Sequence, residues 1–212
     1  MPIFKRLFLF FCEICKLIKQ FAYLILNLFL DLFYDFIYGI NTFAGYTFPQ
    51  LNKFNDEVRY QPTPYLQLKR IKDHLNLSAQ DIFIDLGCGK GRAVCFFSKF
   101  FDNKIIGLEH DNEIYKFLKA NVKSLKKHTK IKLYNKDVSD YKFTNETIIF
   151  MYNPFGEKTL LKVIENINKS IKKIPRKVII IYDMGNKYTL TQNKVFKLKR
   201  KIPNTNFYEW SN

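Results

Sequence analysis

The chain has 212 residues, of which 47% are hydrophobic and 25% are charged, and its formal net charge is +16. This length and composition indicate one globular domain with a substantial core and a short extension, and they exclude a low-complexity chain. The charge favours an anionic partner, either nucleic acid or a membrane surface. Much of it comes from Lys in a sequence rich in Lys, Asn, Ile and Phe, so compositional bias is an alternative explanation.

Two of the four cysteines, Cys12 and Cys15, form a single C-x-x-C. A zinc site needs a second pair or histidine ligands at matching spacing, and neither accompanies this motif. We therefore expect both cysteines to be small apolar residues on one side of a helix, and we predict no metal. Because nothing in the sequence demands disulfides, a reducing, cytoplasmic compartment is expected.

The first 35 residues are intensely apolar, with polar interruptions. On a helical wheel at about 100° per residue, the polar positions fall within an arc of roughly 160°, and the remainder is almost wholly Leu, Phe and Ile. These positions are Lys5, Arg6, Glu13, Lys16, Lys19, Gln20, Asn27, Asp31 and Asp35. The longest stretch without a charge, residues 20–30, is well short of the roughly 20 residues that span a bilayer. The pattern predicts a long amphipathic helix.

This helix has two alternative uses. Its apolar face packs on the domain or on a second copy of the chain, or it lies in a membrane interface. The size of the face favours the membrane, which would make the protein peripheral at the inner face of a membrane through residues 1–35. We divide the chain into an N-terminal helical segment, residues 1–45, and a domain over residues 46–212.

From about residue 60 the sequence alternates between short β-rich runs and amphipathic stretches. The β-rich runs are 81–86, 104–109, 130–134, 147–152 and 177–184, and helices are expected over 111–127 and 157–173. Two further strands, 194–201 and 206–210, are expected to pair antiparallel at the sheet edge. The order predicts an α/β fold with a doubly wound, seven-stranded, mostly parallel sheet of the Rossmann-like kind.

The first predicted strand ends in the glycine-rich run "IDLGCGKGRA". Gly87, Gly89 and Gly91 let the backbone turn tightly and approach a ligand without a Cβ in the way. A nicotinamide fingerprint, G-x-G-x-x-G, would need glycine where this chain has Arg92. The observed pattern instead has Asp85 two residues before the first glycine.

Carboxylates end the next two predicted strands. Glu109 lies 18 residues after Gly91, where a carboxylate can accept hydrogen bonds from both hydroxyls of a ribose. Asp137 follows the third strand and is placed to accept from an adenine amino group. Simple solvation of strand ends is the alternative for both residues.

With these features in order, the sequence resembles the class I S-adenosylmethionine-dependent methyltransferases over about residues 60–212, so that residues 46–212 form the expected methyltransferase domain. The resemblance implies that Asp85, Gly87 and Gly89 line the methionine part of S-adenosylmethionine. It assigns Glu109 to the ribose and Asp137 to the adenine.

The fourth predicted strand ends in "IIFMYNPFG", residues 148–156. In the family that this chain resembles, this turn lies at the reaction centre and resembles the Asn-Pro-Pro-Tyr of amino-methyltransferases, from which Phe155 and Gly156 depart. The oxygen of Asn153 and a carbonyl near Pro154 could accept the N–H bonds of an amine, and Phe155 could stack on a base or hold a cation. A strand-to-helix turn with Asn153 as N-cap is the alternative.

The segment "RYQPTPY", residues 59–65, looks like the stretch before the first strand in compact lysine methyltransferases without a SET domain. This likeness assigns Thr63 and Tyr65 to cofactor binding, and it places Tyr65, Tyr152 and Phe155 around a desolvated lysine amine. The expected function is methylation of an amino nitrogen, most plausibly a protein lysine. The alternatives are methylation of an RNA or DNA base amine, methylation of a small molecule, and a membrane-associated cofactor-binding module.

Overall fold

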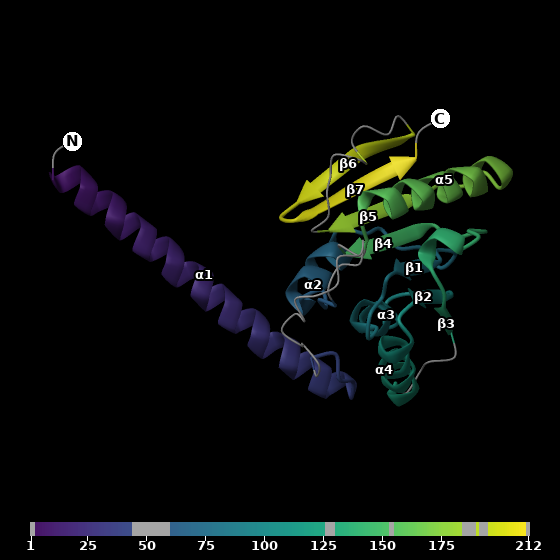
Figure 1. Ribbon diagram of the computed structural model, residues 1–212, viewed down its shortest axis with the longest axis horizontal. Coiled ribbons are helices and arrows are strands. Elements are labelled where there is room, and N and C mark those ends of the chain that lie inside the picture. Colours follow the sequence, from purple (N-terminus) through teal and green to yellow (C-terminus); the bar gives the residue numbers. More distant parts are fainter. Residues whose placement is uncertain are drawn as a thin grey trace.

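The structure is a computed structural model that describes residues 3–43, 60–125, 130–152, 155–183, 190 and 195–210. Its centre is a twisted sheet with helices on both faces, and a long helix projects away from it (Figure 1). The strands are β1 (Phe83–Leu86), β2 (Ile105–Glu109), β3 (Ile131–Asn135), β4 (Ile148–Tyr152), β5 (Ile179–Asp183), β6 (Phe196–Ile202) and β7 (Thr205–Trp210).

The seven strands lie in the order β3-β2-β1-β4-β5-β7-β6. The first five run parallel, and β7 pairs antiparallel with both β5 and β6. Each strand begins and ends within two residues of the predicted run. The prediction of a doubly wound, mostly parallel, seven-stranded sheet with a terminal antiparallel pair is confirmed.

The sheet separates two hydrophobic cores, as expected when a parallel sheet is covered on both faces. One core packs against α2 (Tyr65–Asp73), α3 (Arg92–Phe97) and α4 (Asn112–Ser124), and includes Leu118 and Val122 of α4. The other packs against η1 (Val138–Asp140) and α5 (Glu157–Lys173), and includes Ile164 and Ile167 of α5. The helices after β2 and β4 therefore lie on opposite faces, and their lysines do not share one groove.

The strand β6 forms one edge of the sheet. Only its terminal residues, Phe196 and Ile202, are buried. Between them lie four exposed cations: Lys197, Lys199, Arg200 and Lys201. Its pairing with β7 is interrupted by a register shift between Leu198 and Arg200.

The amphipathic helix predicted for the first 35 residues is α1 (Ile3–Tyr38), a helix of 36 residues that is about 54 Å long at 1.5 Å per residue. Its C-terminal turns contact α2, and the rest projects away from the domain (Figure 1). The exposed apolar side chains on it include Phe8, Phe10, Phe11, Leu17, Ile18, Phe21, Leu24, Ile25 and Phe29. Among the helices that the structure describes, none is both long and apolar enough to span a bilayer.

Candidate functional site

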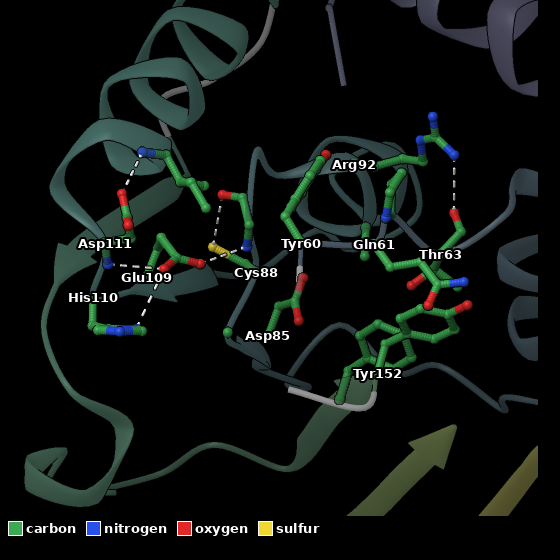
Figure 2. Close-up of a pocket in the computed structure, with 16 residues that line it drawn as sticks. Tyr60, Gln61, Thr63, Asp85, Cys88, Arg92, Glu109, His110, Asp111 and Tyr152 are labelled. Carbon is green, nitrogen blue, oxygen red and sulfur yellow. Dashed lines mark hydrogen bonds and ion pairs between the residues drawn. The ribbon is translucent and has the colours of Figure 1, made fainter. Parts of the chain in front are cut away.

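A pocket opens at the carboxyl ends of β1, β2 and β4. In the sheet β1 has β2 on one side and β4 on the other, so this is the switch point where doubly wound sheets bind ligands. The walls are residues 60–63, the glycine loop, residues 109–111 and the end of β4 (Figure 2). The space between these walls measures about 870 Å³, a figure that includes open solvent at the mouth of the pocket.

The glycine loop makes the tight turns expected from the sequence. Gly87, Gly89 and Gly91 have φ values of 74°, 55° and 88°. A Cβ on Gly89 would collide with the ring of Tyr60, and one on Gly91 would collide with Leu118 of α4. Glycine at these two positions therefore allows both the left-handed backbone and the close approach of neighbouring elements.

Glu109 ends β2 with 6% of its surface exposed. Its Oε2 accepts the N–H of Gly89 at 2.9 Å, and its Oε1 accepts the N–H of Asp111 at 2.9 Å. A carboxylate offers about four lone-pair positions, so acceptor capacity remains for two hydroxyl groups. This arrangement fits the ribose diol assigned to Glu109.

Asp85 in β1 is 3% exposed and faces the pocket beside the glycine loop (Figure 2). Burial, and then the nearby Glu109 carboxylate, raise the pKa of Asp85 well above its usual range. The carboxyl groups of Asp85 and Glu109 make this wall of the pocket acidic, although the whole chain is strongly basic. Such a wall attracts the sulfonium and ammonium groups of S-adenosylmethionine and repels the pyrophosphate of a dinucleotide.

Another wall of the pocket is the segment from Tyr60 to Thr63, which lies beside the glycine loop. The ring of Tyr60 lies against Gly89, and its hydroxyl donates to the carbonyl of Thr42 at 2.8 Å. Thr63 is buried and lines the pocket, and its contact with the cofactor stays a prediction. Tyr60 was not predicted at the site, although it begins the Tyr-x-Pro-x-Pro motif.

The position of Tyr65 corrects its predicted role. Tyr65 begins α2 and has no exposed surface. Its N–H donates to Asp31 at 2.9 Å, its hydroxyl donates to Asp35 at 2.8 Å, and its ring packs against aromatic residues of α1. The side chain is thus directed into the contact with α1, and it is not among the residues that line the pocket.

Asp137 follows β3 as predicted, but it is not among the residues that line the pocket. Its side chain accepts the N–H of Ser139 at 2.7 Å and caps η1. Its contact with adenine stays a prediction.

The turn predicted at the reaction centre is only partly described. Asn153 and Pro154 lie outside the described residues. Phe155 is half-buried and packs against the core on the α5 side of the sheet, whereas Tyr152, at the end of β4, lines the pocket. The roles assigned to Asn153, Pro154 and Phe155 stay predictions.

The structure adds pocket residues that the sequence did not single out. They include Gln61, Cys88, His110, Asp111 and Ile114. Asp111 caps α4 by accepting the N–H groups of Glu113 and Ile114. Its place just after the strand-end Glu109 was the available signal, since residues at this position in such sheets face the ligand.

The family model and the two curated relatives that match this chain carry the names of methylation proteins. The family model described as "Histone methylation protein DOT1" matches residues 47–171. A histone-lysine N-methyltransferase, H3 lysine-79 specific, from Dictyostelium discoideum is 28% identical over 134 residues, which are 56% of this chain and 7% of that protein. A protein-lysine N-methyltransferase from Saccharolobus islandicus is 36% identical over 66 residues, which are 31% of this chain and 41% of that protein. This chain therefore spans less than half the length of either relative.

Among solved structures, an RNA methyltransferase from Salinibacter ruber in complex with S-adenosyl-L-homocysteine is similar with a TM-score of 0.46 and 18% identity, over 71% of this chain and 92% of that one. A segment named StiE O-MT is similar with a TM-score of 0.48 and 17% identity, over 56% of this chain and 43% of that one.

Proposed function

The chain belongs to the DOT1 histone methylation family, whose model matches more than half of it, and we propose that it transfers a methyl group from S-adenosylmethionine to the ε-amino group of a protein lysine. The observation that carries the proposal is the pocket at the switch point of the sheet, where the glycine loop, Asp85 and Glu109 meet. The sequence resemblance to class I methyltransferases and the family match support the same class of reaction.

The residues present fit S-adenosylmethionine. When bound, this cofactor supplies a methyl group on a positively charged sulfur, which keeps the bonding electrons as the methyl passes to a nucleophile. Asp85 would face the cationic methionine end of the bound cofactor, Glu109 would accept from the ribose hydroxyls, and Gly89 adds no side chain to the wall.

The target amine must be neutral when it attacks. Tyr152 contributes an aromatic wall at the end of β4, and desolvation there favours the neutral form of a lysine. Asn153 and Pro154, which follow directly in the sequence, are proposed to accept the N–H bonds of this amine and to aim its lone pair.

A protein lysine is favoured over a nucleic-acid base as substrate. Both curated relatives carry names of lysine methyltransferases. The lysine rows on α4 and α5 lie on opposite faces of the sheet, so they do not form one basic groove for a nucleic acid. Nucleic-acid methylation is therefore an outcome that the assay must be able to detect.

We expect the purified protein to transfer labelled methyl groups from S-adenosylmethionine into a cell extract, and the label to be released by protease but not by nuclease. Asn153→Ala should lower the rate about 100-fold, because the lone pair of the amine would lose its alignment. Asn145→Ala, which changes an exposed asparagine before the start of β4, is the matched control. Label released only by nuclease would replace lysine with a base as substrate, and cofactor binding without transfer would favour a sensing module.

We further propose that α1 holds the protein peripherally on an anionic membrane surface at the cytoplasmic side. The exposed apolar side chains of α1 support contact with lipid. Lys5, Lys16 and Lys19 give its projecting part positive charge against the single Glu13, whereas both aspartates of the helix are directed toward the domain. Charge complementarity therefore favours anionic lipid over a second, equally basic copy of the chain.

We expect the full chain to sediment with vesicles of phosphatidylcholine and phosphatidylserine, and far less with phosphatidylcholine alone. Phe21→Asp combined with Leu24→Asp should abolish the binding, because a charge in the apolar face is costly to bury. Leu161→Asp, at an exposed apolar position of α5, is the control. Lack of vesicle binding together with dimerisation in sedimentation velocity, lost in the double variant, would identify a second copy as the occupant instead.

A further inference from the structure

A buried ionic cluster joins the C-terminal turns of α1 to the cofactor pocket. We name it the Arg92 cluster, and its members are Arg92, Asp31, Asp35, Thr42 and Tyr65. Arg92 begins α3 directly after the glycine loop and is 2% exposed. Its Nη1 donates to Asp31 at 2.7 Å, and its Nε donates to the hydroxyl of Thr42 at 2.7 Å and lies 3.6 Å from Asp35.

The two aspartates of α1 accept most of the hydrogen bonds in this cluster. Asp35 accepts from the N–H of Thr42 at 2.8 Å, from its hydroxyl and from the hydroxyl of Tyr65. Asp31 accepts the N–H of Tyr65, the first residue of α2. One turn of α1 therefore holds the first residues of both α2 and α3.

The cluster also holds both ends of one pocket wall. At one end, the hydroxyl of Tyr60 donates to the carbonyl of Thr42 at 2.8 Å while its ring lies against Gly89. At the other end, Arg92 Nη1 lies 3.4 Å from the carbonyl of Thr63. Because Tyr60 and Thr63 both line the pocket, a shift of α1 would displace this wall relative to the glycine loop.

Stability alone is a poor explanation for such a cluster. Taking an ion pair out of water is expensive, and well-packed apolar residues often stabilise a core at least as well. Here two carboxylates share one guanidinium, and burial above all raises the pKa of Asp31. The guanidinium lies over the ring of Tyr65, and its Nη2 has no hydrogen-bond partner among the described residues. What the cluster provides is fixed geometry between α1 and the pocket.

We propose that Asp31 and Asp35 of α1 are positioning residues for cofactor binding, because through Arg92 and Thr42 they hold residues 60–63 against the glycine loop. This inference rests on the proposed S-adenosylmethionine site. The coupling is reciprocal. Packing of the C-terminal turns of α1 against the domain raises the affinity for the cofactor, and bound cofactor stabilises this packing by the same factor.

The test uses full-length Asp31→Asn and Asp35→Asn proteins. We expect the Kd for S-adenosylhomocysteine, measured by titration calorimetry, to rise at least tenfold in each, and the KM for S-adenosylmethionine to rise more than kcat falls. Asp73→Asn, an exposed aspartate on α2, controls for the loss of a charge. Ile167→Val, buried in the core on the other face of the sheet, controls for lower stability and should leave the Kd unchanged at a similar drop in Tm.

Tyr60→Phe keeps the charges of the cluster and removes only the Tyr60 hydroxyl, with its hydrogen bonds to the carbonyl of Thr42 and to the backbone of Lys90. It therefore tests the same idea if the aspartate variants do not fold. A rise in Kd of about threefold to tenfold is expected for it. If the wild-type protein binds S-adenosylhomocysteine and the aspartate or Tyr60 variants bind it equally well, the positioning role is refuted and the proposed function stands. If the wild-type protein does not bind it, both proposals fail.

Discussion

Asp85→Asn is expected to stabilise the protein without ligand and to weaken S-adenosylmethionine binding by about 100-fold or more. The folded-state pKa of Asp85 is raised by burial and by Glu109, above an unfolded value of about 3.9. For a carboxyl group with a raised pKa, stability falls as the pH rises from the unfolded value toward the folded value. Asparagine cannot ionise, so the variant avoids the loss of stability that comes from ionising a buried carboxyl group. It also lacks the negative charge that would face the cationic cofactor.

Thermal unfolding without ligand at several pH values from 5 to 8, together with calorimetric titration, checks this prediction. The variant should have the higher Tm at neutral pH, by about 2–4 °C for each kcal/mol gained in the free energy of unfolding. The difference in Tm between the variant and the wild-type protein should shrink toward acidic pH. In the wild-type protein, cofactor affinity should fall as the pH falls, because protonation neutralises Asp85. Asp140→Asn, at an exposed position, should change neither property. A variant that is less stable yet binds normally would contradict the assignment of Asp85.

Gly89→Ala is expected to reduce cofactor binding about 100-fold, and Gly39→Ala provides a matched control. Both glycines have a left-handed backbone, with φ values of 55° and 65°, so each alanine adds about 1–2 kcal/mol of backbone strain. A Cβ on Gly89 collides with the ring of Tyr60, whereas a Cβ on Gly39 meets nothing within 4 Å. The difference between the variants therefore isolates the contact between the glycine loop and the pocket wall.

The measurements are Tm and the Kd for S-adenosylhomocysteine in both variants. Adding Tyr60→Ala to Gly89→Ala should recover part of the lost stability, since the double variant removes the atom that collides, and a double-mutant cycle gives the coupling. Equal affinity in the two single variants would mean that Tyr60 is not part of the cofactor wall.

Much of the sheet could be predicted because its strands have a simple pattern. In β2 and β4 apolar residues form short continuous runs that are almost wholly buried, as expected for strands covered on both faces. The ends of such strands meet at one edge, which is why Glu109 and the glycines could be assigned to one site from the order of residues. The resemblance to class I methyltransferases added Asp85.

The Arg92 cluster could not be predicted in the same way. On the helical wheel, Asp31 and Asp35 belong to the same polar arc as Lys5 and Lys16, and this pattern is typical of a solvated face. The structure instead turns these two carboxylates toward the domain, where Asp31 pairs with a residue 61 positions away. No periodicity encodes a pairing at that separation, so Tyr65 was also assigned to the wrong surface.

Part of the +16 charge lies on the edge strand β6, where it hinders pairing with a strand of another chain. An edge strand exposes backbone N–H and C=O groups that can pair with another chain, and lysines and bulges are common means of preventing this. Lys197, Lys199, Arg200 and Lys201 give β6 four exposed cations, and the register shift at Leu198 and Arg200 interrupts its regular ladder. Two copies brought close together by their apolar helices would therefore repel each other at this edge, which protects the protein from aggregation by strand addition.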